Sequence, residues 1–135
     1  MRRVSGHPVE ARELNEAALA GLVKGLGLDH HYSLTVATNL ASDFAVLGET
    51  ARARKLGEDT LARLRDVMGS DHPLTLGCAA NLVVDLRADL ADKEAERLHA
   101  DTLSRYEATL GLDHRDATNA EAGERLDFDF DPPPI

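Results

Sequence analysis

Apolar residues in the middle of the chain recur with the period of an α-helix. Between residues 32 and 47 they stand three and four positions apart, which places them on one helical face. This first stripe consists of Leu34, Ala37, Leu40, Ala41, Phe44 and Leu47. After a break at Gly48-Glu49, a second stripe consists of Leu56, Leu61, Leu64 and Met68. The pattern predicts two amphipathic helices in succession, helix A over residues 32–47 and helix B over residues 50–68.

The same pair of helices recurs 42 residues further along the chain. An alignment of residues 27–68 with residues 69–110, without a gap, has 14 identical positions, far more than chance would give. In the first copy these are Gly27, Asp29, His30, Leu34, Ala37, Asn39, Leu40, Asp43, Ala53, Leu56, Asp59, Thr60, Leu61 and Arg63. A fixed interval of this length is typical of a helical repeat array.

The register extends to both sides of the two full repeats. Ala11, Leu14 and Leu19 lie 42 residues before Ala53, Leu56 and Leu61, so residues 9–26 form a half repeat, a B helix without its A helix. Gly111, Asp113 and His114 begin a degenerate cap over residues 111–126, with a short final helix. We therefore predict an all-α repeat domain over residues 1–126, about 2.5 repeats of antiparallel helix pairs, followed by a tail over residues 127–135.

The expected helices span residues 9–26, 32–47, 50–68, 73–90 and 92–110. Each B helix ends near a glycine, which adopts a left-handed conformation at low cost, and an Asp-His pair then starts the next A helix, with Pro73 in the second repeat. The expected buried positions are Leu40, Phe44, Leu56, Leu61, Leu82, Leu86, Leu98 and Leu103. Leu90 stands where the first repeat has Gly48, so the second A/B turn departs from the first.

Composition supports helices and narrows the range of partners. The chain is 43% hydrophobic but only 4% aromatic, without Trp, so Leu, Ala and Val must build the core. The net charge of −9 increases towards the C-terminus: +1 before Gly27, −1 over residues 27–68, −4 over residues 69–110 and −5 thereafter. This acidity disfavours nucleic acid and admits a basic peptide.

Candidate chemistry is sparse. His30, His72 and His114 each follow an Asp in a Gly-x-Asp-His sequence. Equivalent side chains of adjacent repeats are separated by about the 8–10 Å between packed helices, which is too far to share one metal ion through bonds of about 2 Å. Helix capping is therefore the favoured role. The single Cys78 aligns with Val36 and is expected to be a packed thiol. No nucleophile elbow, phosphate loop or dinucleotide fingerprint is present. We expect no catalysis, no metal and no cofactor, and, without a signal or membrane-spanning segment, a cytoplasmic protein.

The run Gly69-Ser70-Asp71-His72-Pro73-Leu74-Thr75-Leu76, with Asn81-Leu82-Val83 and Ala95-Glu96-Arg97-Leu98 after it, resembles the tetratricopeptide repeat family. The similarity is to the 42-residue subclass typified by kinesin light chains, and it covers about Ala11 to Thr118. It implies a right-handed α-solenoid that serves as a protein–protein interaction scaffold. Its concave groove, formed by the A helices, would hold an extended peptide.

Asn39 and Asn81 are the candidate groove residues. An Asn lowers helix propensity, and its amide offers one acceptor and two donors that suit the backbone of an extended peptide. The resemblance implies that these side chains line the groove and bind peptide backbone. Asp43 and Asp85 lie one turn further on, so each A helix presents an Asn and then an acid. The alternative is that the two Asn side chains bind a neighbouring loop and fix the stacking of repeats.

Two functions follow from this reading. The first is a non-catalytic module that binds an extended peptide of a partner protein. The alternative is a structural or assembly module, or a fragment of a larger regulator, that associates with itself through the first helix. Because that helix lacks its A helix, Leu14, Leu19, Leu22 and Leu26 cannot all be covered, and a homodimer is expected through this end.

The last nine residues form a separate candidate segment. Asp127, Phe128, Asp129, Phe130 and Asp131 alternate, which places both rings on one side of an extended chain, and three prolines then enforce a polyproline conformation. We expect Phe128 and Phe130 to dock in an apolar groove of this molecule or of another. The alternative is a mobile acidic tail that aids solubility.

Overall fold

The computed structural model describes residues 8–27, 29–109, 111 and 115–122. In this part of the chain every regular element is an α-helix. The helices are α1 (Pro8–Leu26), α2 (His31–Val46), α3 (Thr50–Val67), α4 (Pro73–Ala88), α5 (Asp92–Thr109) and α6 (Arg115–Glu121). The prediction of an all-α repeat array is confirmed, and the predicted ends of the first five helices agree with the observed ends to within two residues.

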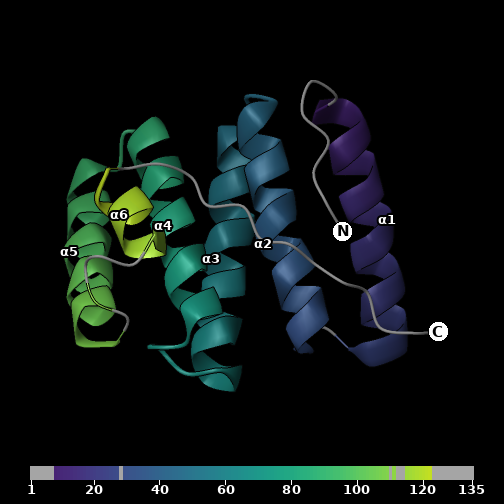
Figure 1. Ribbon diagram of the computed structural model, residues 1–135. Helices are drawn as coiled ribbons and strands as arrows, with labels where there is room; N and C mark the ends of the chain where they lie inside the picture. Colours follow the sequence, from purple (N-terminus) through teal and green to yellow (C-terminus); the bar gives the residue numbers. More distant parts are fainter. Residues whose placement is uncertain (1–7, 28, 110, 112–114, 123–135) are drawn as a thin grey trace.

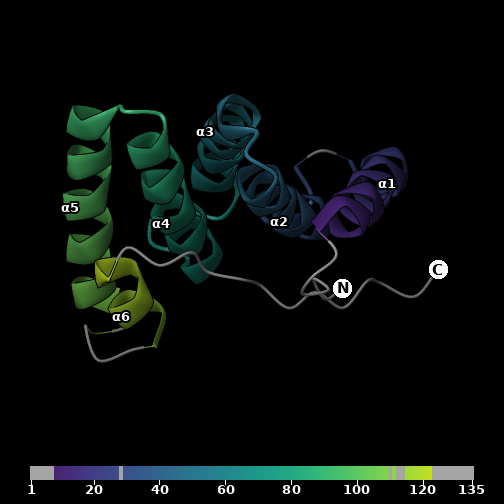
Figure 2. The same cartoon turned by 90° about the horizontal axis from the view of Figure 1, so that it is seen from above.

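Consecutive helices pack against one another in chain order, and α6 packs on α5 and α4 (Figure 1). By register, α2 and α4 are A helices and α1, α3 and α5 are B helices, while α6 stands in an A position. Figure 2 shows α2 and α4 towards one side of the array and α3 towards the other. The A helices also contact each other directly. Each A helix therefore lies between two B helices, and its side chains have neighbours on several sides.

The repeated turn residues explain where the A helices begin. Gly27 and Gly69 have φ angles of +94° and +92°, in the left-handed region that glycine adopts without strain. His30 and His72 are the N-cap residues, and their Nδ1 atoms accept hydrogen bonds from the backbone N–H groups of Tyr32 (3.2 Å) and Leu74 (3.1 Å). Pro73 then occupies the first helical position, where no N–H is needed. The predicted capping role of His30 and His72 is confirmed.

Among the described residues, the core consists of three clusters along the array. One lies between α1, α2 and α3, a larger one joins α2 to α5, and the third joins α4 and α5 to α6. Of the predicted core residues, Leu40, Phe44, Leu61, Leu82 and Leu86 are buried. The prediction is wrong for Leu56, Leu98 and Leu103, which are only half-buried. These three lie on B helices, which are packed less completely than the A helices between them.

Helix α1 has a partly uncovered apolar side. Leu14 is 54% exposed and Val9 and Leu26 are also exposed, whereas Leu56 and Leu98, at the same register position as Leu14, are half-buried. Leu56 packs against Leu40 and Phe44 of the preceding A helix. The exposure of Leu14 therefore reflects the lack of such a helix beside α1 in the described structure. No helix among the described residues is both long enough and apolar enough to cross a membrane.

Candidate functional site

The two A helices carry all four candidate groove residues, and all four are buried. In α2 the burial is continuous over the twelve residues from Ser33 to Phe44. Asn39 and Asn81 are 2% and 3% exposed, and Asp43 and Asp85 are similarly enclosed. A buried Asn or Asp must satisfy its polar atoms locally, because an unsatisfied buried polar group costs about 1–3 kcal/mol. The two helices therefore hold matched pairs of polar side chains inside the array.

Asp43 has a partner that the sequence pattern did not indicate. The Nδ2 group of Asn15, in α1, donates a short hydrogen bond to Oδ2 of Asp43, and both side chains are buried. This bond joins α1 to α2 within their interface. A hydrogen bond to a charged group contributes about 1.5–3 kcal/mol when it is buried and well aligned. Asp43 thus fixes the packing of the half repeat on the first full repeat.

The equivalent place in the next repeat is built differently. Gly57 stands 42 residues after Asn15, and a Cβ atom added to Gly57 would lie 3.9 Å from Oδ2 of Asp85 and 3.1 Å from Cδ1 of Leu82. Asp85 therefore faces α3 as Asp43 faces α1, but α3 offers no side chain there. The Sγ atom of Cys78 lies 3.8 Å from the carbonyl oxygen of Gly57, which also brings α4 close to α3.

Other repeated polar residues act in the framework of the repeats. Asp29 pairs with Arg63 at 3.0 Å, and 42 residues later Asp71 pairs with Arg105 at 2.9 Å. These ion pairs tie the turn before each A helix to the following B helix. They lie on the surface, where solvent and salt screen them, so each contributes little to stability. Together with the glycine turns and the His caps, they account for the repeated Gly, Asp and His without any binding role.

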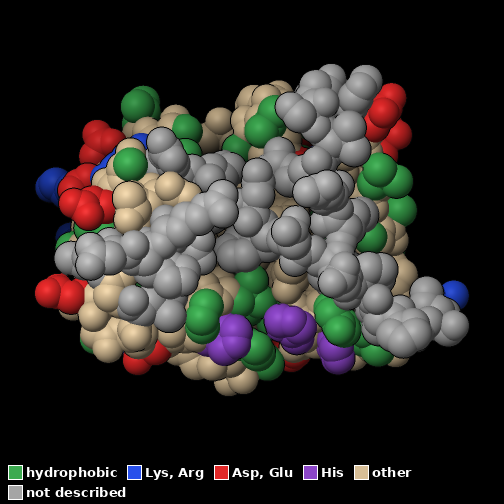
Figure 3. All heavy atoms as spheres, viewed as in Figure 1, with side chains coloured by type: hydrophobic (Ala, Val, Ile, Leu, Met, Phe, Trp, Pro, Cys, Tyr) green, Lys and Arg blue, Asp and Glu red, His purple; other side chains and the backbone are tan. Residues whose placement is uncertain are grey.

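His30, His72 and Cys78 have structural surroundings in the part of the chain that the structure describes. Figure 3 shows histidine side chains at the edge of the molecule where, in Figure 1, the turns into α2 and α4 lie. His114 lies outside the described residues. Among the side chains that the structure describes, no group of three or more His, Cys, Asp or Glu could hold a metal ion. Cys78 is buried in the central cluster, and this burial raises the pKa of its thiol to about 12, so the thiolate is scarce at neutral pH.

The predicted tail site, Phe128 and Phe130, also lies outside the described residues. The described part of the chain therefore presents two A helices with enclosed Asn and Asp pairs, and the surfaces between helices. Stacked helix pairs with equivalent polar positions define an α-solenoid, the architecture in which each repeat contacts only its neighbours.

The comparison with family models agrees with this architecture. A model described as tetratricopeptide repeat matches residues 33–74 and residues 75–116, two adjoining units with the 42-residue interval. The chain belongs to the tetratricopeptide repeat family, and the 42-residue interval is consistent with the kinesin-light-chain-like subclass. No curated protein matches the sequence. Tetratricopeptide repeats generally mediate protein–protein interaction, which gives the class of function for this chain.

Proposed function

We propose that this chain is a non-catalytic module that binds an extended peptide segment of a partner protein along its A helices. The observation that carries the proposal is the repetition of Asn39 as Asn81, one per repeat, at the same position of the two A helices. Asn side chains spaced one repeat apart match the regular donors and acceptors of an extended backbone.

The acids beside the two Asn side chains indicate the chemistry of the peptide. Asp85 lies on α4 in the second repeat, where its Oδ2 atom faces α3 near Gly57. The repeat that contains it has a net charge of −4. A peptide with Lys or Arg near the second repeat would therefore be attracted, and its binding should weaken as salt is added.

The burial of Asn39 and Asn81 affects how tightly a peptide can bind. Asn39 and Asn81 are less than 5% exposed, so a peptide contacts them only after the surface above them has opened. Opening costs free energy, which lowers the apparent affinity by the fraction of molecules that are open. We therefore expect moderate affinity, and a rise in affinity for any variant that favours the open form.

The test is to select peptides for binding to the full chain from a random library and to measure their affinity by fluorescence anisotropy. A double variant, Asn39→Ala with Asn81→Ala, removes both amides. If each contributes about 0.5–1.5 kcal/mol, affinity should fall roughly 5- to 150-fold. Lys55→Ala is the matched control, because Lys55 lies on the exposed side of α3 with its side chain 82% exposed.

The alternative role of the two Asn side chains gives a different result. If they only hold the repeats together, the double variant should unfold at lower urea concentration, while the folded molecules should bind the peptide with unchanged affinity. Circular dichroism in urea and anisotropy at low temperature separate these effects. An unchanged affinity in folded protein would refute the groove.

The exposed side of α1 favours a second candidate function, self-association. Leu14, Val9 and Leu26 are exposed, whereas Leu56, the counterpart of Leu14 in α3, is half-buried against α2. A homodimer through this helix would bury them. Sedimentation velocity at several concentrations tests this: we expect a concentration-dependent dimer that Leu14→Lys abolishes, and a monomer at high concentration would count against it.

A further inference from the structure

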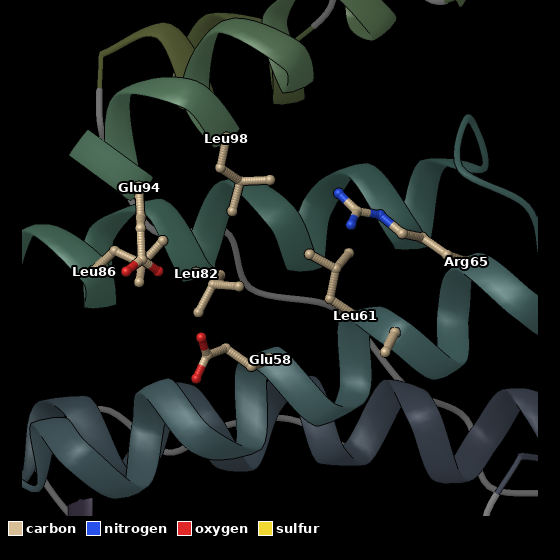
Figure 4. Close-up of a pocket in the computed structure, with 8 residues that line it drawn as sticks. Glu58, Leu61, Arg65, Leu82, Leu86, Glu94 and Leu98 are labelled. Atoms are coloured by element: carbon tan, nitrogen blue, oxygen red, sulfur yellow. The ribbon is translucent and has the colours of Figure 1, made fainter. Parts of the chain in front are cut away.

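A pocket of about 260 Å³ lies between α3 and α5, with α4 beneath it. Its apolar lining consists of Leu61, Leu82, Leu86 and Leu98, and its rim consists of Glu58, Ala62, Arg65 and Glu94. Figure 4 shows Leu61, Leu82 and Leu98 directed towards a common space, with Glu58 and Glu94 towards one end and Arg65 towards the other. Ligand pockets for drug-sized molecules occupy about 300–1,000 Å³. This pocket is therefore of a size for one large side chain.

The counterpart of this pocket, 42 residues earlier, lies between α1 and α3, and there the space is filled. The residues 42 positions before Leu61, Leu82 and Leu98 are Leu19, Leu40 and Leu56, so these three lining positions are leucine in both places. Leu86, however, becomes Phe44, and the phenyl ring packs among those three leucines. The pocket between α3 and α5 is therefore the space that a phenylalanine occupies between α1 and α3.

The charge at the mouth of the pocket also differs between the two positions. Glu94 stands where the first repeat has Arg52, whose guanidinium lies 5.2 Å from the centre of the Phe44 ring. The first repeat thus carries an aromatic ring covered by a cation, an arrangement that is itself favourable. In the second repeat the ring is missing and the cation is replaced by an acid.

Carboxylates outnumber cations at the end of the pocket near Glu58 and Glu94. Arg54 pairs with Asp89 at 2.9 Å, with Glu94 at 3.1 Å and with Glu58 at 3.6 Å. One guanidinium therefore serves three carboxylates, and this end of the pocket keeps a net negative charge. Arg65, towards the other end, limits the negative region to the side of Glu58 and Glu94. A ligand cation is accommodated beside those two residues.

We propose that this pocket is a second docking site, which takes a phenylalanine side chain of a partner protein followed by Arg or Lys. The ring would fill the space between Leu61, Leu82 and Leu98, as Phe44 does between their counterparts. The cation would lie beside Glu94, where Arg52 lies in the first repeat. The partner supplies from outside the two groups that the second repeat lacks.

The chain's own tail is a poor occupant. Phe128 and Phe130 are each flanked by Asp on both sides, so their docking would bring further acids to an acidic mouth. The pocket also does not depend on the groove of the A helices, because neither Asn39 nor Asn81 lines it. One chain would therefore contact a partner on two surfaces, and both contacts together would raise the overall affinity.

The probe for this site is the capped dipeptide acetyl-Phe-Arg-amide, titrated into the full chain and followed by methyl NMR. We expect shift changes centred on the methyl groups of Leu61, Leu82 and Leu98. Leu86→Phe should fill the pocket from within and weaken binding about tenfold or more. The chain itself shows that this exchange is tolerated, because Phe44 occupies the equivalent position. A urea titration confirms that the variant is folded.

Two further comparisons test the charge and the independence of the site. Acetyl-Phe-Glu-amide should bind more weakly than the Arg dipeptide, and Glu94→Gln should reduce that difference. The double variant Asn39→Ala with Asn81→Ala should bind the dipeptide like the unchanged chain, so a failure of the groove does not decide the pocket. Shift changes spread over the surface, binding that Leu86→Phe leaves unaltered, or equal binding of both dipeptides would overturn the proposal.

Discussion

Leu90 provides a sharp test of how the repeats determine stability. Helix α4 ends in a turn in which the backbone N–H of Leu90 donates to the carbonyl oxygen of Arg87 (3.1 Å) and that of Ala91 donates to Leu86 (2.8 Å). The turn after α2 has the same two hydrogen bonds, from Gly48 and Glu49. Leu90 has a φ of +60° and Gly48 has a φ of +79°, so Leu90 adopts the left-handed conformation that a glycine adopts at this position of the first repeat.

Two opposing free-energy terms determine how stability changes when leucine and glycine are exchanged at this turn. A left-handed conformation costs a residue with a Cβ atom about 1–2 kcal/mol. Glycine loses about 0.5–1 kcal/mol more backbone entropy on folding. Leu90 is 84% exposed, so its side chain adds little burial. Leu90→Gly should therefore raise the free energy of unfolding by about 0.5–1 kcal/mol, and Gly48→Leu should lower it by a similar amount.

Urea and thermal denaturation followed by circular dichroism measure both variants. For a domain of this size, a change of 1 kcal/mol corresponds to a shift of about 4 °C in melting temperature. The denaturant slope should stay the same, because the surface exposed on unfolding hardly changes. If Leu90→Gly destabilised the chain, the leucine side chain would be making a contact that outweighs its backbone strain, and the account of this turn would be wrong.

Three further predictions concern the core, a helix cap and the tail. Leu82→Ala should cost about 2–5 kcal/mol of stability in urea, because Leu82 is buried between α3, α4 and α5; a loss below 1 kcal/mol would contradict that packing. His72→Ala should cost about 0.5–2 kcal/mol through loss of the cap on α4, whereas His72→Asn should retain most of it, and equal losses would refute the capping role. Deletion of residues 127–135 should tighten binding of groove peptides, if the tail competes for the groove; unchanged affinity, oligomeric state and melting temperature would leave it a solubility segment.

The helices could be predicted from the sequence because local signals coincide with the repeat. Gly69 ends one helix, His72 caps the next and Pro73 starts it, and the same order recurs with Gly27 and His30. Leucine spacing alone would have given the helices but not their ends. The interval of 42 residues supplied the independent check that a single helix pair lacks.

The polar interior could be predicted only in part. Asn39, Asp43, Asn81 and Asp85 stand out because they repeat. Asn15, which binds Asp43, does not repeat: the equivalent residues are Gly57 and His99. A contact made at a single interface leaves no periodic signal, since it depends on which side chains the neighbouring helix brings close. The half-burial of Leu56 likewise follows from the depth at which α3 packs, which the leucine pattern does not encode.

Identities between the repeats thus identify the framework, whereas differences between them identify what is particular to this chain. Leu86, Leu90 and Glu94 replace Phe44, Gly48 and Arg52, and all three lie at the end of α4 and the start of α5. Leu86 and Glu94 line the pocket between α3 and α5, while Glu94 and Leu90 border a shallow pocket at the adjoining turn. The first change opens a space, the second places a strained and exposed leucine beside it, and the third reverses the charge at its mouth. None of the three improves the packing of the array. Because they border two adjoining pockets at the α4–α5 end of the array, they are better explained by a common ligand than by independent drift, and restoring all three to the residues of the first repeat should yield a more stable chain that has lost those pockets.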